Sequence, residues 1–201
     1  MGNYRESNTK YSEKLAIDIL KKLDMEAVSN NHDDITKVDL LVGDKNIKID
    51  VQYSQNFLKY GDLRVDFVSA YSDGCKGNFF HSNILFQEFE TQHGFRVDKV
   101  GKWFQDDYLD AAIILFYNYE LVQNYTMPDK ILIITQDILL KNLHNKISDV
   151  ILNHKKDLGD KHGSAFIPIN VEQLVQNCSC YYGSIFDLID KKDDIKKYLN
   201  Y

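Results

Sequence analysis

Hydrophobic residues near the start of the chain recur with the spacing of an amphipathic helix. Apolar side chains follow one another four residues apart at Leu15, Ile19 and Leu23. This spacing places them on one helical face, so it predicts a helix that ends near Asp24. The polar residues at 7–9 are candidate N-caps, and Glu13 then falls in the first turns of the helix.

Between residues 36 and 53 the hydrophobic period changes to two, which is typical of β-strands. The alternating apolar positions are Val38, Leu40, Val42, Ile47, Ile49 and Val51. Residues 43–46 form the turn of a hairpin, and both a two-residue and a four-residue turn pair Val42 with Ile47. In this register all six apolar side chains share one face, and Asp39 lies opposite Asp50 on the other. The remaining pairs on that second face are Lys37 with Gln52 and Lys48 with Leu41.

The later part of the chain alternates further strands and helices. Strands are predicted at residues 63–69 and 165–169, and helices at 83–90, after Thr135 as far as Val150, and close to the C-terminus. Continuous apolar runs at 111–117 and 131–134 are typical of strands that are covered on both faces. The order of elements predicts an α/β fold in two or three layers, with a mixed β-sheet flanked by helices.

Length and composition favour one folded domain. The chain has 201 residues, 44% of them hydrophobic, and includes 13 tyrosines, 11 phenylalanines and one tryptophan. With two prolines and no linker-like or repeated segment, we expect a single domain over residues 1–201. No run approaches the ~20 apolar residues of a membrane-spanning helix, so we expect no membrane partner and a cytoplasmic protein.

Three cysteines, an odd number, fit a reducing compartment better than a set of disulfides. Cys178 and Cys180 leave two interpretations open: a zinc site completed by His154 or His162, although neither spacing is a recognised ligand pattern, or two buried thiols.

The Asp39 and Asp50 pair is the feature of this sequence with the clearest chemical meaning. Carboxylates directly opposite each other on paired strands lie ~5 Å apart at Cβ and repel each other. A divalent cation with oxygen ligands relieves this repulsion. The alternative is an ordinary solvated hairpin face, on which Lys37 and Lys48 offset the acidic charge.

These residues resemble the PD-(D/E)XK nuclease superfamily, whose pattern is a helix with an acid, a strand with Asp, a turn, and a strand with the triplet acid-x-Lys. Here Val38-Asp39 stands for the Pro-Asp element without its proline, and Asp50-Val51-Gln52 stands for the triplet with Gln in place of Lys. Glu13 resembles the additional acid on the family's first helix. The resemblance implies a restriction-endonuclease-like core at about residues 8–117, with an α/β elaboration at about 118–201.

The resemblance also implies a metal-dependent nuclease. Asp39, Asp50 and the main-chain carbonyl of Val51 would bind Mg²⁺ or Mn²⁺, with Glu13 as an additional ligand. In the family the triplet lysine is taken to orient water and to stabilise charge on the phosphate. Gln52 can orient water but carries no charge, so either Lys48 or Lys37 supplies the cation or the protein is a slow or inactive member.

Nucleic acid, DNA more than RNA, is the implied partner, with a homodimer as a possible assembly. Lys37, Lys59 and Arg64 are the expected phosphate contacts, and aromatic side chains near them would either stack on bases or pack in the connecting segment. The net charge of −6 gives no global attraction for phosphate, so such contacts would be local. The alternative function is an inactive protein of this fold that binds nucleic acid or another protein.

Overall fold

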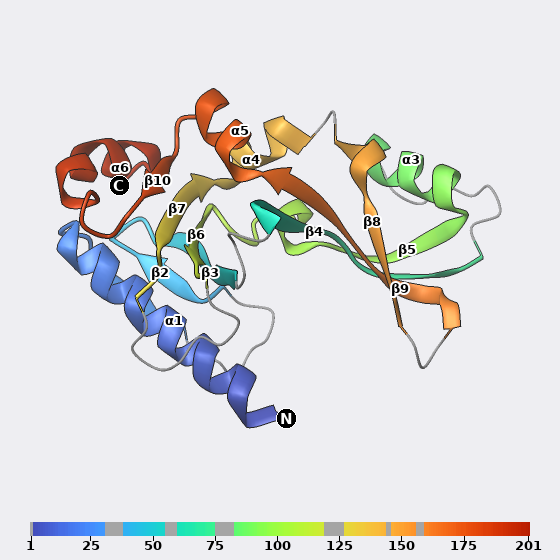
Figure 1. The fold of residues 1–201 in the computed structure, drawn as a ribbon, viewed down its shortest axis with the longest axis horizontal. Coiled ribbons are helices and arrows are strands. Elements are labelled where there is room, and N and C mark those ends of the chain that lie inside the picture. Colours follow the sequence, from blue (N-terminus) through green and yellow to red (C-terminus); the bar gives the residue numbers. More distant parts are fainter. Residues whose placement is uncertain are drawn as a thin grey trace. The chain divides into compact units, whose positions relative to one another are not determined.

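The structure, a computed structural model, describes residues 2–30, 38–54, 60–74, 83–118, 127–143, 146–155 and 159–201. The chain divides into two compact units that are interleaved in sequence (Figure 1). The first unit comprises Met1–Gly61, Asp107–Leu139 and Val171–Tyr201. The second unit comprises Asp62–Asp106 and Leu140–Asn170. The sequence suggested a core at about residues 8–117 followed by an elaboration at about 118–201. The two units do not follow this boundary, since both contain residues before and after position 117.

The first unit is built on a six-stranded mixed sheet with the order β1-β2-β3-β6-β7-β10. All neighbouring strands are antiparallel except β3 and β6, which are parallel. The structure thus confirms an α/β fold with a mixed sheet flanked by helices. The strands are β1 (Ala27–Ser29), β2 (Leu40–Val42), β3 (Ile47–Ser54), β6 (Ala111–Phe116), β7 (Lys130–Thr135) and β10 (Tyr181–Gly183).

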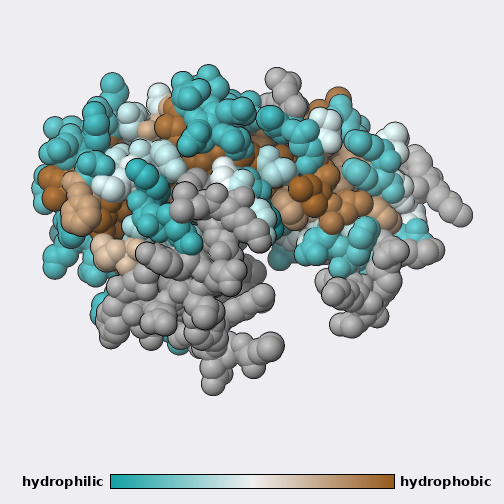
Figure 2. Space-filling model, viewed as in Figure 1, coloured by the Kyte–Doolittle hydropathy of each residue, from teal (hydrophilic) through white to brown (hydrophobic). Residues whose placement is uncertain are grey.

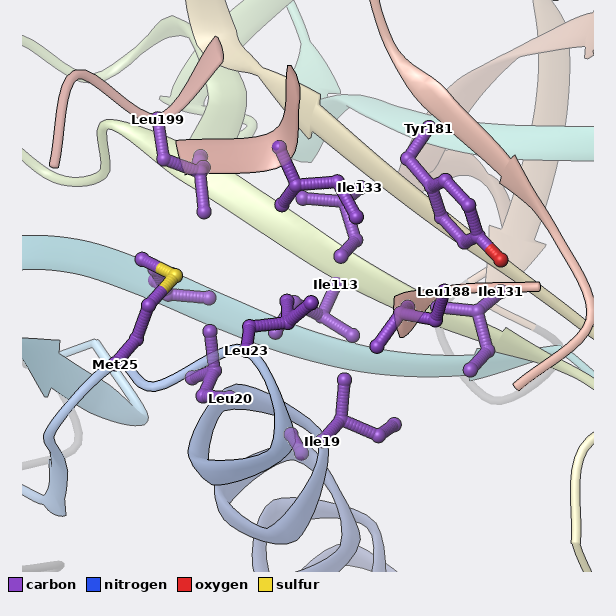
Figure 3. Close-up of a cluster of buried hydrophobic side chains, with 14 of the residues drawn as sticks. Ile19, Leu20, Leu23, Met25, Ile113, Ile131, Ile133, Tyr181, Leu188 and Leu199 are labelled. Atoms are coloured by element: carbon purple, nitrogen blue, oxygen red, sulfur yellow. The ribbon is translucent and has the colours of Figure 1, made fainter. Parts of the chain in front are cut away.

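Helix α1 (Gly2–Lys22) supplies the N-terminal part of the core of the first unit. Its apolar residues pack against alternate residues of β3, β6 and β7, together with side chains from the C-terminal segment (Figure 3). The helix begins before the expected caps at residues 7–9, because Ser, Asn and Thr are also tolerated inside a helix, where each costs less than about 1 kcal/mol relative to alanine, and residues 2–6 contain no proline. Glu13 therefore lies near the middle of α1, not in its first turns.

The hairpin register predicted from the turn is confirmed. Val42 pairs with Ile47, and Leu40 with Ile49. The turn requires a left-handed backbone at both ends, with φ of +64° at Gly43 and +52° at Asn46, a conformation that glycine and asparagine adopt at low cost.

The two continuous apolar runs form central strands, as predicted. Every residue of β6 is buried, and so are Ile131–Ile134 in β7. The helix after β7 is shorter than expected: α4 (Gln136–Leu143) stops well before Val150, and residues 147–149 form a separate 3₁₀ turn, η2 (Ile147–Asp149). The first unit is completed by α5 (Val171–Asn177), η3 (Ile189–Lys191) and α6 (Lys192–Tyr198).

The second unit is an antiparallel sheet with the order β5-β4-β9-β8, packed against α3. Its core is aromatic: the Phe67 ring stacks on Phe86 with centroids 4.9 Å apart and meets Phe89 and Phe104 edge-on. Asn83 caps α3 by accepting a hydrogen bond from the Leu85 N–H. The elements are β4 (Asp62–Asp73), α3 (Ile84–His93), β5 (Phe95–Val100), η1 (Lys102–Phe104), β8 (Ile151–Lys155) and β9 (Gly159–Asn170).

The surface of the described residues is mainly hydrophilic in the view of Figure 2, with smaller hydrophobic areas between the polar ones. No described helix is both long enough and apolar enough to cross a membrane.

Candidate functional site

Asp39 lies immediately before β2, and its carboxylate reaches across to β3. Its Oδ2 atom accepts a hydrogen bond from the main-chain N–H of Val51, with a donor–acceptor distance of 2.6 Å. The main-chain carbonyl of Asp39 accepts a second hydrogen bond, from the N–H of Asn30. Since the ladder pairs Leu40 with Ile49, the next residues outward are Asp39 and Asp50, so the two are cross-strand neighbours by register.

Asp50 is buried, with 4% of the residue exposed. The side chains of Ile49 and Val51 belong to the core beneath α1, so alternation along β3 directs Asp50 to the opposite face. Gln52 lies on the same face two residues later, and its Nε2 donates a hydrogen bond of 2.7 Å to Asp50 Oδ2. Interpreting Asp50 as a solvated surface position is therefore wrong, because so little of the residue is exposed.

Lys48, also on this face of β3, holds the segment that precedes β6. The main-chain N–H of Lys48 donates to Asp110 Oδ2 at 2.7 Å, and the Asp110 N–H donates back to the Lys48 carbonyl at 2.8 Å. The Lys48 ammonium donates to the main-chain carbonyl of Asp107 at 2.6 Å. Asp107 has a φ of +54°, a left-handed turn conformation that aspartate tolerates. Residues 107–110 are thus fastened to β3 two residues before Asp50.

Tyr108 is carried by this fastened segment, within electrostatic range of the two aspartates. Its pKa is raised above its ordinary value, first by burial and then by the negative charges of Asp50 and Asp39. The phenol is therefore protonated at neutral pH and acts as a hydrogen-bond donor.

Tyr108 had no place in the site proposed from sequence. A signal was nevertheless present: residues 107–110 lead into a strand that pairs in parallel with the strand of Asp50, and neighbouring parallel strands begin at the same edge of a sheet.

Glu13 is buried on α1, with 4% of the residue exposed. Because α1 packs on the face of the sheet that carries Ile49 and Val51, Glu13 approaches the sheet from the side opposite to Asp50. Among the described residues, no three His, Cys, Asp or Glu side chains are grouped as ligands of one metal ion. Glu13 as an additional ligand stays a prediction.

The other expected metal ligands, Asp39, Asp50 and the Val51 carbonyl, all offer oxygen atoms, which hard divalent cations prefer. Asp39 and Asp50 offer carboxylate oxygens, and a carboxylate has lone pairs for several partners, of which the hydrogen bond on each Oδ2 uses one. The carbonyl of Val51 is an oxygen ligand of the kind that Mg²⁺ takes, with water filling other positions. Two carboxylates, one carbonyl and water are sufficient for Mg²⁺ without a third acidic side chain.

Of the expected phosphate contacts, only Arg64 lies among the described residues, and it belongs to the second unit, whereas Asp39 and Asp50 belong to the first. Arg64 lies on β4 in the second unit, where its guanidinium stands over the Phe166 ring, 5.1 Å from the centroid, and pairs with Asp62 at 3.5 Å. Lys37 and Lys59 lie outside the described residues. Tyr53 packs against the core of the first unit, which favours the packing interpretation for this aromatic residue.

The two described cysteines, Cys178 and Cys180, are half-buried thiols that are not joined in a disulfide. Burial, with a smaller effect of Cys178, raises the pKa of the Cys180 thiol to about 11. His154, one of the two histidines considered as a zinc ligand, bonds through Nδ1 to the hydroxyl of Tyr71 at 2.8 Å. These features support the interpretation as thiols, not as zinc ligands.

In comparisons with known proteins, no family model matches this chain and no curated protein matches its sequence.

Proposed function

We propose that the chain is a metal-dependent phosphodiesterase that hydrolyses nucleic acid, DNA more than RNA, on a restriction-endonuclease-like core. The observation that carries the proposal is the pairing of two aspartates on adjacent strands, with Asp50 almost fully buried and Asp39 bonded to the main chain of β3. A buried carboxylate next to a second one is costly unless a cation or a proton compensates for the charge.

The arrangement of elements also supports the proposal. A helix with a buried acid precedes a strand entered by Asp39, a turn, and a strand with the triplet Asp50-Val51-Gln52. This is the order on which the resemblance to PD-(D/E)XK nucleases depends.

In the proposed mechanism, Asp39, Asp50 and the Val51 carbonyl hold Mg²⁺ or Mn²⁺. The bound ion would offset charge on the scissile phosphate and lower the pKa of a water molecule. Gln52 keeps Asp50 in place through its Nε2 and retains its amide oxygen as an acceptor for the attacking water. In the overall reaction, water adds to phosphorus, the phosphorus–oxygen ester bond breaks, and the leaving oxygen takes up a proton.

A second function, an inactive binding module of the same fold, is favoured by the contacts of Lys48 and Gln52. The third position of the triplet has an amide that is bonded to Asp50, and the nearby Lys48 ammonium bonds to the Asp107 carbonyl. With this arrangement the site has weaker support for negative charge developing on the phosphate than the family pattern implies.

Cleavage separates the two functions. The purified protein is incubated with single- and double-stranded DNA and RNA in Mg²⁺ or Mn²⁺, beside the variants Asp50→Asn and Asp44→Asn. We expect wild type and Asp44→Asn, which alters an exposed residue of the turn, to cleave DNA and Asp50→Asn to be inactive. Equal cleavage by Asp50→Asn would place the activity elsewhere, and no cleavage by wild type under any condition would leave the binding module as the better function.

A further inference from the structure

Strand β1 has an outer edge to which no other strand of the described residues pairs. It lies at one end of the six-stranded sheet, and β2 is its sole neighbour there. Main-chain hydrogen bonds of 2.8 and 2.9 Å join Glu26 and Asn30 to the residues that flank β2. Because bonding to one neighbour alternates along an antiparallel strand, Ala27 and Ser29 direct their N–H and C=O groups away from β2.

This edge also carries an exposed apolar side chain. Ala27 packs against the core beneath α1, so alternation directs Val28 to the other face of the sheet, where 62% of the residue is exposed. Residues 25–30 contain no lysine or proline, which commonly protect the edge of a sheet from pairing. On the side of α1, a groove of about 700 Å³, lined in part by Ile17 and Met25, adjoins β1. Within the described part of the chain, the edge is therefore open to a second strand.

We propose that β1 pairs antiparallel with β1 of a second copy of this chain, around a twofold axis at Val28, to form a homodimer with one continuous sheet. In this register Ala27 of each copy faces Ser29 of the other. These are the positions with outward N–H and C=O groups, so each pair exchanges main-chain hydrogen bonds. Val28 then faces Val28 of the second copy in a non-hydrogen-bonded pair, where opposite side chains lie closest, and the two exposed valines bury each other.

The charges along the strand favour the same register. Glu26 is the one charged residue between positions 25 and 30, and with the axis at Val28 it faces Asn30 of the second copy instead of another acid. Moving the axis to Ala27 would place Val28 opposite Glu26, and moving it to Ser29 would place Val28 opposite Asn30. Both shifts set an apolar side chain against a polar one, so the axis at Val28 gives the best cross-strand pairs.

The contact is isologous, because the same strand is used by both copies and covers the outer edge of β1 in each. Since β1 has three residues, the interface is small, and we expect a dimer Kd on the order of 10 µM. Dimerisation of this kind does not depend on the proposed nuclease activity, and it is measured without nucleic acid.

The test is sedimentation velocity of wild type and variants at protein concentrations below and above this Kd. Val28→Lys and Val28→Glu should each raise the dimer Kd by about a hundredfold, because like charges would meet at the axis and the apolar contact would be lost. Ile151→Lys is the matched control, since Ile151 is also exposed, at 45%, on an edge strand, but β8 belongs to the second unit. This control should dimerise as wild type does.

An equimolar mixture of Val28→Lys and Val28→Glu tests the register itself. Opposite charges then face each other at the axis, so the mixture should dimerise about tenfold more tightly than either variant alone. This recovery requires that position 28 of one copy lies opposite position 28 of the other. The melting temperatures of the two variants as monomers should match that of monomeric wild type, because the side chain is exposed.

A dimer that weakens in both variants, recovers in their mixture and is unchanged by Ile151→Lys supports the proposal. Wild type that stays monomeric at all these concentrations overturns it, and so does a Val28→Lys variant that dimerises as well as wild type. A mixture that dimerises no better than the single variants also overturns it, because the pairing would then not be centred on Val28.

Discussion

The side chains of Asp39 and Asp50 are each oriented by a donor on β3. The N–H of Val51 holds Asp39, and the amide of Gln52 holds Asp50. Both of these bonds come from uncharged donors, so neither of them supplies a positive charge to the carboxylate that it orients. A cation bound by both carboxylates would offset the repulsion between them and stabilise the folded state.

We therefore expect Mg²⁺ to raise the melting temperature of wild type but not of Asp50→Asn. At a free Mg²⁺ concentration of about 100 times Kd, a ligand that binds only the native state adds about 2.7 kcal/mol, or about 5–10 °C for a chain of this size. The measurement is thermal unfolding with and without Mg²⁺. Asp44→Asn, in the exposed turn, serves as the control and should respond as wild type does.

Two outcomes of that experiment bear on the charge repulsion. Without metal, Asp50→Asn should be at least as stable as wild type, because the amide keeps an acceptor for Gln52 while the charge is lost. An equal response of both proteins to Mg²⁺ would show that the ion binds at another place.

A second prediction for a single residue concerns Gln52 and the rate of cleavage. Gln52→Ala should lower the cleavage rate by about 10²-fold, the range for one polar group that acts in the transition state. The affinity for Mg²⁺ should change little, because both aspartates remain. Cleavage rates and Mg²⁺ titrations of wild type and variant check this, and an unchanged rate would exclude the proposed role of Gln52.

Replacing Gln52 by Lys tests the same position in the other direction. The variant restores the charge of the family triplet beside Lys48, whose ammonium already bonds to Asp107. The new ammonium would bring a positive charge to the phosphate, so faster cleavage is the expected result if repulsion between the two lysines does not disturb the site.

Among the elements, the contact between β4 and the segment after β5 depends on one missing side chain. Gly101 lies where β4 is bulged, and its N–H donates to the Phe67 carbonyl. A Cβ atom added at Gly101 would stand 1.8 Å from the main-chain oxygen of Asp66. Its backbone φ of −64° is ordinary, so the requirement for glycine comes from this close approach alone.

Gly101→Ala should accordingly destabilise the protein by about 3 kcal/mol, since the backbone of β4 has to move to admit the methyl group. Gly94→Ala is the matched comparison: Gly94 ends α3 with a φ of +70° and has open space around it, so alanine should cost only about 1 kcal/mol. Urea unfolding of both variants measures the two costs. A cost for Gly101→Ala no larger than that for Gly94→Ala would contradict this account of the β4 contact.

At the scale of the whole molecule, stability should fall in alkaline solution. The pKa of Cys180 is raised from 9.0 to about 11 and that of Tyr181 from 10.0 to about 12, in both cases mainly by burial. The unfolded chain releases these protons at lower pH than the folded chain does. The stability linked to these groups is therefore complete below pH 9 and is lost as pH rises through the folded-state pKa values.

Urea unfolding at a series of pH values from 8 to 11 tests this expectation, with wild type compared to Cys180→Ser. The serine hydroxyl does not titrate in this range, so the free energy of unfolding of the variant should fall less steeply with pH. Parallel curves for the two proteins would show that Cys180 contributes nothing to the alkaline loss of stability.

Sequence alone determined the features that depend on residues close together in the chain. Alternation of period two, with a turn at 43–46, was sufficient to pair Val42 with Ile47 and Leu40 with Ile49, the register from which Asp39 and Asp50 follow as the next residues outward. The apolar runs were sufficient to predict that β6 and β7 are buried on both faces. These predictions succeeded because side-chain direction follows from local backbone geometry.

Only the tertiary structure decided which distant segments meet. It placed β6 parallel to β3, and with it Asp107 and Asp110 against Lys48. It also joined β4 to β9, about 100 residues later in the chain, in the sheet of a second unit. Strand neighbours of this kind depend on the burial of whole sheet faces and on the closure of long loops. Local hydrophobic periodicity carries no information about either. The burial of Asp50 was likewise decided by tertiary structure, because the strand that carries it has β6, from far along the chain, as its parallel neighbour and thus lies inside the sheet and not at its edge.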